Sequence, residues 1–160
     1  MTKPDTVVVL AAGQGTRMRL PGAKVLHAAC GRPLIAWVLD QARALDPRRV
    51  LVVIGHEAES VSEAVDGWAR ANGWQGRVRC VLQEPQNGTG HALLCCLPEL
   101  GSPPEGVVVV LYGDMPLLRP QSLERLCAAQ ADAAAGATGG AAALLVASPP
   151  DPRGFGRILR

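Results

Sequence analysis

A glycine-rich segment near the N-terminus contains the first residues whose types and spacing suit a chemical task. Gly13, Gly15 and Arg17 lie in the run Gly-Gln-Gly-Thr-Arg, and Lys24 follows shortly after. Glycines let backbone N–H groups approach oxygen atoms closely, and a loop of such groups is a ready anion site. A guanidinium can hold two phosphate oxygens, and an ammonium adds a point charge. The segment indicates a phosphate site, although an ordinary glycine turn with two solvated cations stays open.

Two widespread nucleotide motifs do not fit this loop. The dinucleotide fingerprint has a third glycine where Met18 stands here, and no acidic residue ends a second strand at the required distance. The P-loop sequence Gly-Lys-Ser/Thr is also absent. An NAD-binding oxidoreductase is therefore the last of the candidate classes.

A second motif, Gln83-Glu-Pro-Gln-Asn-Gly88-Thr89-Gly-His, follows a short apolar run and precedes an expected helix. The Gln83 amide offers both a donor and an acceptor, which suits the edge of a nucleobase. Gly88 and Thr89 can present a backbone group and a hydroxyl to the same ring. The alternative is that Thr89 caps the helix, which stabilises a helix by about 1 kcal/mol and carries no chemistry. The two interpretations are compatible.

A third motif, Tyr112-Gly113-Asp114-Met-Pro116, ends the strongest strand pattern in the chain. A lone carboxylate after a glycine, at the end of a buried strand, is poorly explained by packing. It suits Mg²⁺, which takes one or two protein carboxylates together with substrate phosphate oxygens. The alternative is that Asp114 stabilises the turn before Pro116.

Other catalytic classes lack their motifs. The three histidines, His27, His56 and His91, show no ligand spacing such as H-x-x-x-H, and no serine lies in G-x-S-x-G. Metal hydrolases and serine esterases are therefore not favoured, and the histidines are expected to have structural or supporting roles.

The amino-acid composition excludes further classes of protein. The 160 residues suit one domain, and 48% hydrophobic with 19% charged residues excludes a disordered chain. A net charge of +2 and an aromatic share of 3% give no reason to expect a nucleic-acid partner. The apolar run 7–12 is too short for a signal peptide or a membrane span. Five cysteines without C-x-x-C are expected to be reduced, buried thiols of a cytoplasmic protein with no membrane partner.

The apolar pattern predicts the elements that position the three motifs. Strands are expected at 6–10, 50–54, 78–82, 107–112 and 141–147, and helices at 33–45, 57–71, 90–97 and 120–135. Apolar strands alternating with helices are typical of an α/β fold whose mostly parallel sheet is covered on both faces. Ligands of such sheets bind beyond the carboxyl ends of the strands, where the motifs stand.

Taken in order, five segments resemble the sugar nucleotidyltransferases, and most of all the N-terminal uridyltransferase domain of the bifunctional enzyme that makes UDP-N-acetylglucosamine. The segments are Leu10-Ala-Ala-Gly-Gln-Gly-Thr-Arg-Met18, Lys24-Val-Leu-His27, Gln83…Gly-Thr-Gly-His-Ala92, Tyr112-Gly-Asp-Met-Pro-Leu117 and Gly154-Phe-Gly-Arg-Ile158. The resemblance covers essentially the whole chain from Val7. It implies a Rossmann-like, three-layer nucleotide-diphospho-sugar transferase fold.

The resemblance also implies a reaction and its residues. UTP and N-acetylglucosamine 1-phosphate would give UDP-N-acetylglucosamine, a precursor of peptidoglycan and lipopolysaccharide, and pyrophosphate, with Mg²⁺ as cofactor. The uridine would be held by Leu10, Ala11, Ala12, Gly13, Gln83, Gly88 and Thr89. The triphosphate would be held by Gly15, Thr16, Arg17 and Lys24, of which Arg17 and Lys24 are the catalytic residues. The metal would be bound by Asp114, and Tyr112, Gly113 and Gly156 would line the nucleotide–sugar site.

The sequence departs from the family pattern in two places. Family members usually place proline directly before the loop lysine, whereas this chain has Ala23, so the position of Lys24 is expected to be less fixed. Family members also continue beyond the point that corresponds to Arg160, supplying an asparagine as a second metal ligand and an acetyltransferase domain that drives trimerisation. Residues 1–160 are therefore expected to be a nucleotidyltransferase domain lacking its C-terminal part, with little turnover alone and no trimer.

Two alternatives stay open. One is a molybdopterin guanylyltransferase or cytidylyltransferase, which shares the first-loop pattern and an Asp-Met-Pro after a strand; the Gln83 motif favours the uridyltransferase. The other is a remnant that binds nucleotide without turnover.

Overall fold

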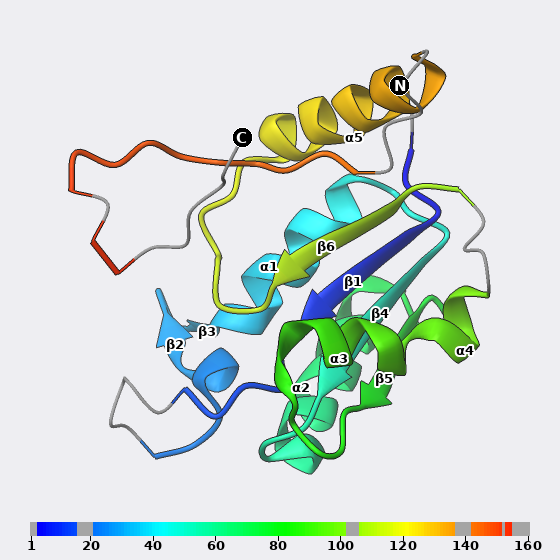
Figure 1. The fold of residues 1–160 in the computed structure, drawn as a ribbon. Helices are drawn as coiled ribbons and strands as arrows, with labels where there is room; N and C mark the ends of the chain where they lie inside the picture. The colour runs from blue at the N-terminus through cyan, green and yellow to red at the C-terminus, as the bar shows by residue number, and fades with distance from the viewer. Residues whose placement is uncertain (1–2, 16–20, 102–105, 137–141, 152, 155–160) are drawn as a thin grey trace.

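The computed structural model describes residues 3–15, 21–101, 106–136, 142–151 and 153–154. Its centre is a sheet of four parallel strands (Figure 1). These are β1 (Thr6–Leu10), β4 (Arg49–Ile54), β5 (Val78–Leu82) and β6 (Val108–Tyr112), in the spatial order β5-β4-β1-β6. In the register of the sheet, Val8 pairs with Leu51 on one side and with Val110 on the other.

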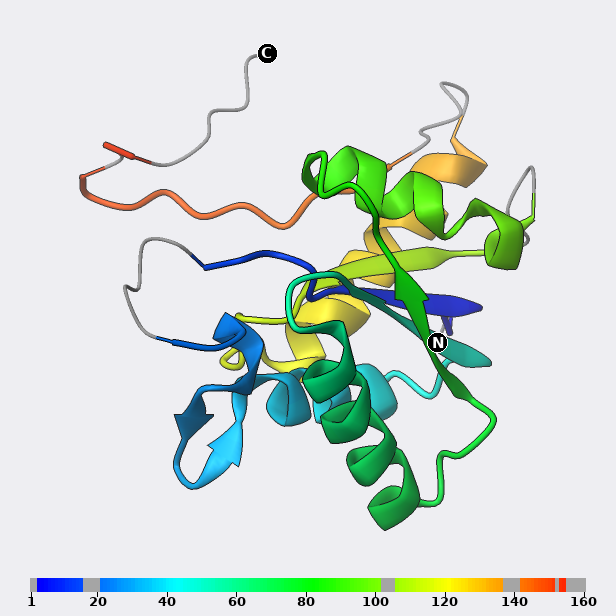
Figure 2. The same ribbon diagram turned by 90° about the horizontal axis from the view of Figure 1, so that it is seen from below.

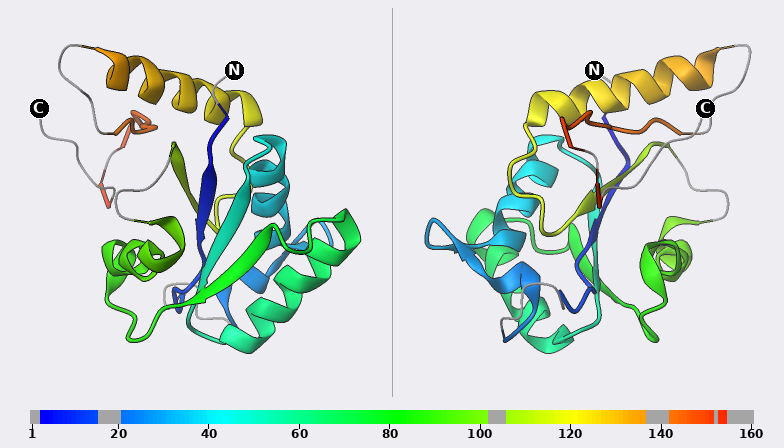
Figure 3. Two further views of the ribbon diagram at one scale, coloured as in Figure 1. Left: turned by 90° about the vertical axis from the view of Figure 1, so that its right-hand side faces the viewer. Right: turned by 60° about the vertical axis from the view of Figure 1, so that its left-hand side comes forward.

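Helices cover both faces of the sheet and make three layers (Figure 3). On one face lie α1 (Leu34–Ala44), α2 (Ala58–Asn72) and α5 (Pro120–Ala135), packed against alternate strand residues such as Val7 and Val9. On the other lie α3 (Gly88–Cys95) and α4 (Leu97–Leu100), packed against Val8 and Leu51. The two apolar clusters explain why the inner strands read as continuous apolar runs. The expected α/β class is confirmed.

The connections between the strands cross both faces of the sheet. The chain passes from β1 through α1 to β4 over one face, and from β5 through α3 and α4 to β6 over the other. Since β6 then pairs with the free side of β1, the strand order reverses between these two strands. Open parallel sheets bind ligands outside the carboxyl ends of the strands at such a reversal.

A small substructure joins β1 to α1. It consists of the 3-10 helix η2 (Lys24–Leu26) and a two-stranded hairpin of β2 (Ala28–Ala29) and β3 (Arg32–Pro33), seen from below in Figure 2. The sequence pattern did not predict it, because strands of two residues carry no periodicity. It carries Lys24, so it belongs to the site.

One expected helix has different bounds, and one expected strand was wrong. The helix expected at 90–97 begins at Gly88, two residues earlier, and is followed by the separate short helix α4. Thr89 therefore lies inside the first turn and is not the cap; Asn87 is the N-cap residue, without a side-chain hydrogen bond. The described residues 142–147 form no strand, because Leu144, Leu145 and Val146 are exposed and no strand pairs with them.

The cysteines are all free, but they are not all buried. Cys96 and Cys127 are buried, and burial raises the pKa of the Cys96 thiol to about 11. Cys30 is exposed because it stands in the turn of the β2–β3 hairpin, away from the sheet. Within the described ranges, no helix is both long enough and apolar enough to cross a membrane.

The core predicts a stability result. Leu39 of α1 is fully buried between the helix and the sheet, so Leu39→Ala is expected to lower the free energy of unfolding by about 3 kcal/mol. Leu144→Ala is the matched control, because that leucine is 73% exposed, and it is expected to change the free energy of unfolding by less than about 0.5 kcal/mol. Urea denaturation of both variants measures the difference, and equal losses would contradict this assignment of the core.

Candidate active site

A pocket of about 630 Å³ opens at the carboxyl ends of β1 and β6, at the predicted end of the sheet. Its walls come from the loop after β1, from η2, from the β5–α3 connection with the start of α3, and from the end of β6. The lining residues are Leu10, Ala11, Ala12, Gly13, Gln14, Gly15, Lys24, Val25, Gln83, Gln86, Gly88, Thr89, Ala92, Tyr112 and Asp114.

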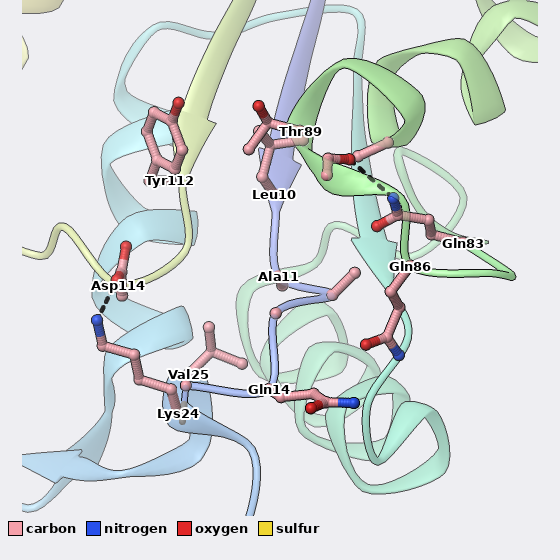
Figure 4. A pocket seen from close by; sticks show the side chains of 15 residues that line it. Leu10, Ala11, Gln14, Lys24, Val25, Gln83, Gln86, Thr89, Tyr112 and Asp114 are labelled. Atoms are coloured by element: carbon pink, nitrogen blue, oxygen red, sulfur yellow. Dashed lines mark hydrogen bonds and ion pairs between the residues drawn. The ribbon is translucent and has the colours of Figure 1, made fainter. Parts of the chain in front are cut away.

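One end of the pocket carries opposite charges (Figure 4). Lys24 Nζ donates to Asp114 Oδ2 over 2.5 Å, although the two residues are 90 positions apart in the sequence. Gly15 packs against the lysine stem, because a Cβ at position 15 would lie 2.7 Å from the Cβ of Lys24. Gly15 also has a φ of +63°, which side chains rarely adopt. Glycine at position 15 is therefore required for the approach of Lys24.

The other end presents uncharged hydrogen-bonding groups. The side chain of Gln83 is buried, and its Nε2 donates to the carbonyl of Gly88 over 2.9 Å and lies 3.2 Å from Nδ1 of His91. The amide nitrogen is thus held by the protein, which leaves Oε1 as an acceptor on the pocket side (Figure 4). Gly88 and Thr89 begin α3, and the first N–H groups of a helix have no partner within it. This end offers an acceptor beside free donors.

The structure brings most of the expected residues to one place. Of the candidates that lie in the described ranges, eleven line the pocket: Leu10, Ala11, Ala12, Gly13, Gly15, Lys24, Gln83, Gly88, Thr89, Tyr112 and Asp114. Thr16, Arg17 and Gly156 lie outside the described residues. The structure shows where these residues lie, and their roles stay predictions.

Gly113 lies behind the pocket wall. A Cβ there would lie 3.0 Å from Val25 Cγ1 and 3.1 Å from the carbonyl oxygen of Leu10, to which the Gly113 N–H donates over 2.9 Å. Gly113 therefore lets the end of β6 pack closely against β1, and it is not among the residues that line this pocket. Its place at the nucleotide–sugar site stays a prediction. Sequence reasoning also missed lining residues, namely Gln14, Val25, Gln86 and Ala92. All four stand within the quoted motifs, so adjacency in sequence was the available signal.

The donor set at the charged end suits Mg²⁺ better than a transition metal. Among the described residues, Asp114 is the one carboxylate that lines the pocket, and no group of three or more His, Cys, Asp or Glu side chains is placed to hold an ion. Mg²⁺ commonly takes one or two protein carboxylates and completes its shell with water and substrate phosphates. Asp114 fits that role.

Comparison with known proteins agrees with this geometry. The profile of the family described as "MobA-like NTP transferase domain" matches residues 7–153. The bifunctional protein GlmU of Streptomyces avermitilis is 45% identical over 158 residues, covering 99% of this chain and 30% of that protein. GlmU of Paracidovorax citrulli is 48% identical over 158 residues, with coverages of 96% and 30%. A solved nucleotidyl transferase from Methanothermobacter thermautotroptrophicus superposes with a TM-score of 0.62 at 26% identity, covering 77% of this chain and 56% of that one.

The fold and the site together define a nucleotidyltransferase of the nucleotide-diphospho-sugar transferase fold. The chain belongs to the family of MobA-like NTP transferase domains, and the two relatives described above are GlmU proteins, matched in their N-terminal part. The chain spans about 30% of the length of these relatives.

Proposed function

We propose that the pocket binds UTP and that the protein transfers the uridylyl group to N-acetylglucosamine 1-phosphate, giving UDP-N-acetylglucosamine and pyrophosphate. The observation that carries the proposal is the division of one pocket into two ends. A neutral end with Gln83 and the start of α3 faces a charged end with Lys24 and Asp114. A nucleoside triphosphate has the same division, between a neutral base and an anionic chain.

The neutral end suits the N3 edge of uracil. Uracil presents an N–H at position 3 between two carbonyl oxygens, whereas cytosine has an acceptor at position 3. Oε1 of Gln83, to which no described residue donates, accepts from an N–H and repels an acceptor. The free N–H groups at the start of α3 donate to a carbonyl. Leaving a buried polar group unpaired is what makes such discrimination effective.

The charged end suits phosphoryl chemistry without a protein base. An oxygen of the sugar phosphate attacks the α-phosphorus of UTP, a new P–O bond forms, and the bond to the bridging oxygen breaks to release pyrophosphate. A phosphate is already an anionic nucleophile at neutral pH, so alignment and charge neutralisation are the main requirements. Lys24 supplies positive charge. Mg²⁺ held by Asp114 would neutralise phosphate oxygens.

Nucleotide preference tests the proposal. In isothermal titration with Mg²⁺, the chain is expected to bind UTP more tightly than CTP or GTP. Gln83→Ala is expected to weaken UTP binding about tenfold, because a hydrogen bond in a buried site is lost. The same substitution at Gln14, a pocket residue whose side chain makes no hydrogen bond to the described part of the chain, is the matched control. A preference for GTP or CTP would contradict the uridylyl assignment.

A second candidate is the molybdopterin-type nucleotidyltransferase, which the MobA-like description of the matching family favours. It differs in its base, so the same titration separates the two. Release of pyrophosphate from UTP and N-acetylglucosamine 1-phosphate then separates an enzyme from a domain that binds nucleotide without turnover.

A further inference from the structure

Residues 55–57, which follow β4, contact the glycine-rich loop after β1 at both of its ends. Before residues 16–20, the N–H of His56 donates to the carbonyl of Ala12 over 3.3 Å. After them, the N–H of Ala23 donates to Oε2 of Glu57 over 2.9 Å. Gly55 also packs closely against Ala12, since a Cβ at position 55 would lie 3.0 Å from the Cβ of Ala12. Residues 55–57, here called the brace, therefore contact the expected phosphate loop at Ala12 and at Ala23.

Glu57 has an unusual backbone for a side chain of its size. Its φ of 52° and ψ of 44° are left-handed, and it stands at the N-cap of α2 without a side-chain hydrogen bond to that helix. Residues other than glycine are disfavoured in this region, and such strain gathers at functional sites. The carboxylate instead accepts a hydrogen bond from a residue 34 positions earlier. Helix α2 does not explain why a glutamate stands at position 57, whereas its contact with Ala23 does.

Ala23 transmits the contact to Lys24. It is buried, it is the N-cap residue of η2, and it directly precedes the lysine. Its N–H would otherwise be a buried donor, and pairing it with a carboxylate gives a strong hydrogen bond. Lys24 is thus held at its backbone through Glu57, at its stem by Gly15 and at its ammonium by Asp114.

We propose that Glu57 is a positioning residue, which holds the start of η2 so that the Lys24 ammonium is aimed at the phosphates of the nucleotide. The proposal rests on the proposed function. It also answers the expectation that Ala23 leaves Lys24 loosely placed: an alanine keeps the N–H that proline lacks, and Glu57 uses that N–H as an anchor.

The first test compares Glu57→Gly with Glu57→Gln. Glycine relieves the left-handed strain but leaves the Ala23 N–H unpaired, and these two effects on stability oppose each other. The melting temperature is therefore expected to change little while UTP affinity falls about five- to tenfold. Glutamine keeps an acceptor oxygen and is expected to retain most of the affinity. Binding of uridine, which has no phosphates, is expected to change in neither variant. Glu59→Gln, in the first turn of the same helix, is the matched control for the lost charge.

The second test is a double-mutant cycle with Ala23→Pro. Ala23 has a φ of −65°, which proline adopts, so this substitution removes the N–H without requiring a new backbone angle. If the brace acts through this one hydrogen bond, the losses in UTP affinity from Ala23→Pro and Glu57→Gly are strongly non-additive. Additive losses would show that the two residues act separately, and they would overturn the proposal.

The outcomes separate the two proposals. A wild-type chain that binds UTP no better than uridine overturns the proposed function, and the positioning role with it. A wild-type chain that prefers UTP, together with a Glu57→Gly variant of equal UTP affinity, overturns the positioning role alone. A fall in melting temperature with equal losses for UTP and uridine would identify Glu57 as merely structural, and this too contradicts the proposal.

Discussion

Asp114→Ala is expected to abolish the Mg²⁺-dependent part of UTP binding, a loss of about a hundredfold or more. Asp114 supplies the one carboxylate that lines the pocket within the described part of the chain. Without it a bound Mg²⁺ would have no carboxylate ligand among the described pocket residues, and the nucleotide phosphates would lose that link to the end of β6. Titration with UTP in Mg²⁺ and in EDTA separates the metal-dependent part of the affinity from the rest.

The fold of the Asp114 variant is expected to be intact. The ion pair with Lys24 is partly exposed, and exposed pairs contribute only about 0–1 kcal/mol to stability. Asp46→Asn is the matched control, because Asp46 also pairs with cations, Lys3 and Arg77, but follows α1 at the opposite end of the sheet. Unchanged Mg²⁺-dependent binding in Asp114→Ala would remove this residue from the site.

Lys24→Met is expected to weaken UTP binding by about 2 kcal/mol, or about thirtyfold, both with and without Mg²⁺. Methionine keeps most of the stem that packs on Gly15 and removes only the ammonium. In the structure that ammonium neutralises Asp114 over 2.5 Å. Loss of Lys24 therefore removes an attraction for phosphate and leaves a carboxylate that repels phosphate.

When the metal is removed, the two substitutions are expected to change the affinity for UTP in opposite directions. In EDTA, Asp114→Ala removes a negative charge and frees Lys24, so UTP binds more tightly than to the wild type. Under the same conditions Lys24→Met binds more weakly. Titration of both variants in EDTA decides the matter, with Lys3→Met as the control for a lost surface lysine. Changes of the same sign would contradict the assignment of opposite roles.

Much of the fold could be predicted because its signals are local. The strands β1 and β5 and the helix α5 begin and end where the apolar pattern predicts. The residues 142–147 have an equally apolar pattern but form no strand, since a strand also requires a neighbour to accept its hydrogen bonds. The same limit hid the two-residue strands of the hairpin, which depend on each other for their definition.

The site shows a similar division between local and tertiary causes. The types and spacing of residues in the three motifs indicated a phosphate end, a base end and a carboxylate, because glycines, cations and amides have restricted chemical uses. Their resemblance to one family indicated the reaction class. The sequence by itself therefore determined the class of fold and which residues were candidates.

Only the tertiary structure decided how those candidates act on one another. The pairing of Lys24 with Asp114 spans 90 positions and the contact of Ala23 with Glu57 spans 34, and both depend on the sheet order that places β1 between β4 and β6. Gly113 packs closely against Leu10 and Val25 because β6 lies next to β1. Contacts between distant segments follow from the packing of whole layers, and no local window of sequence contains that packing.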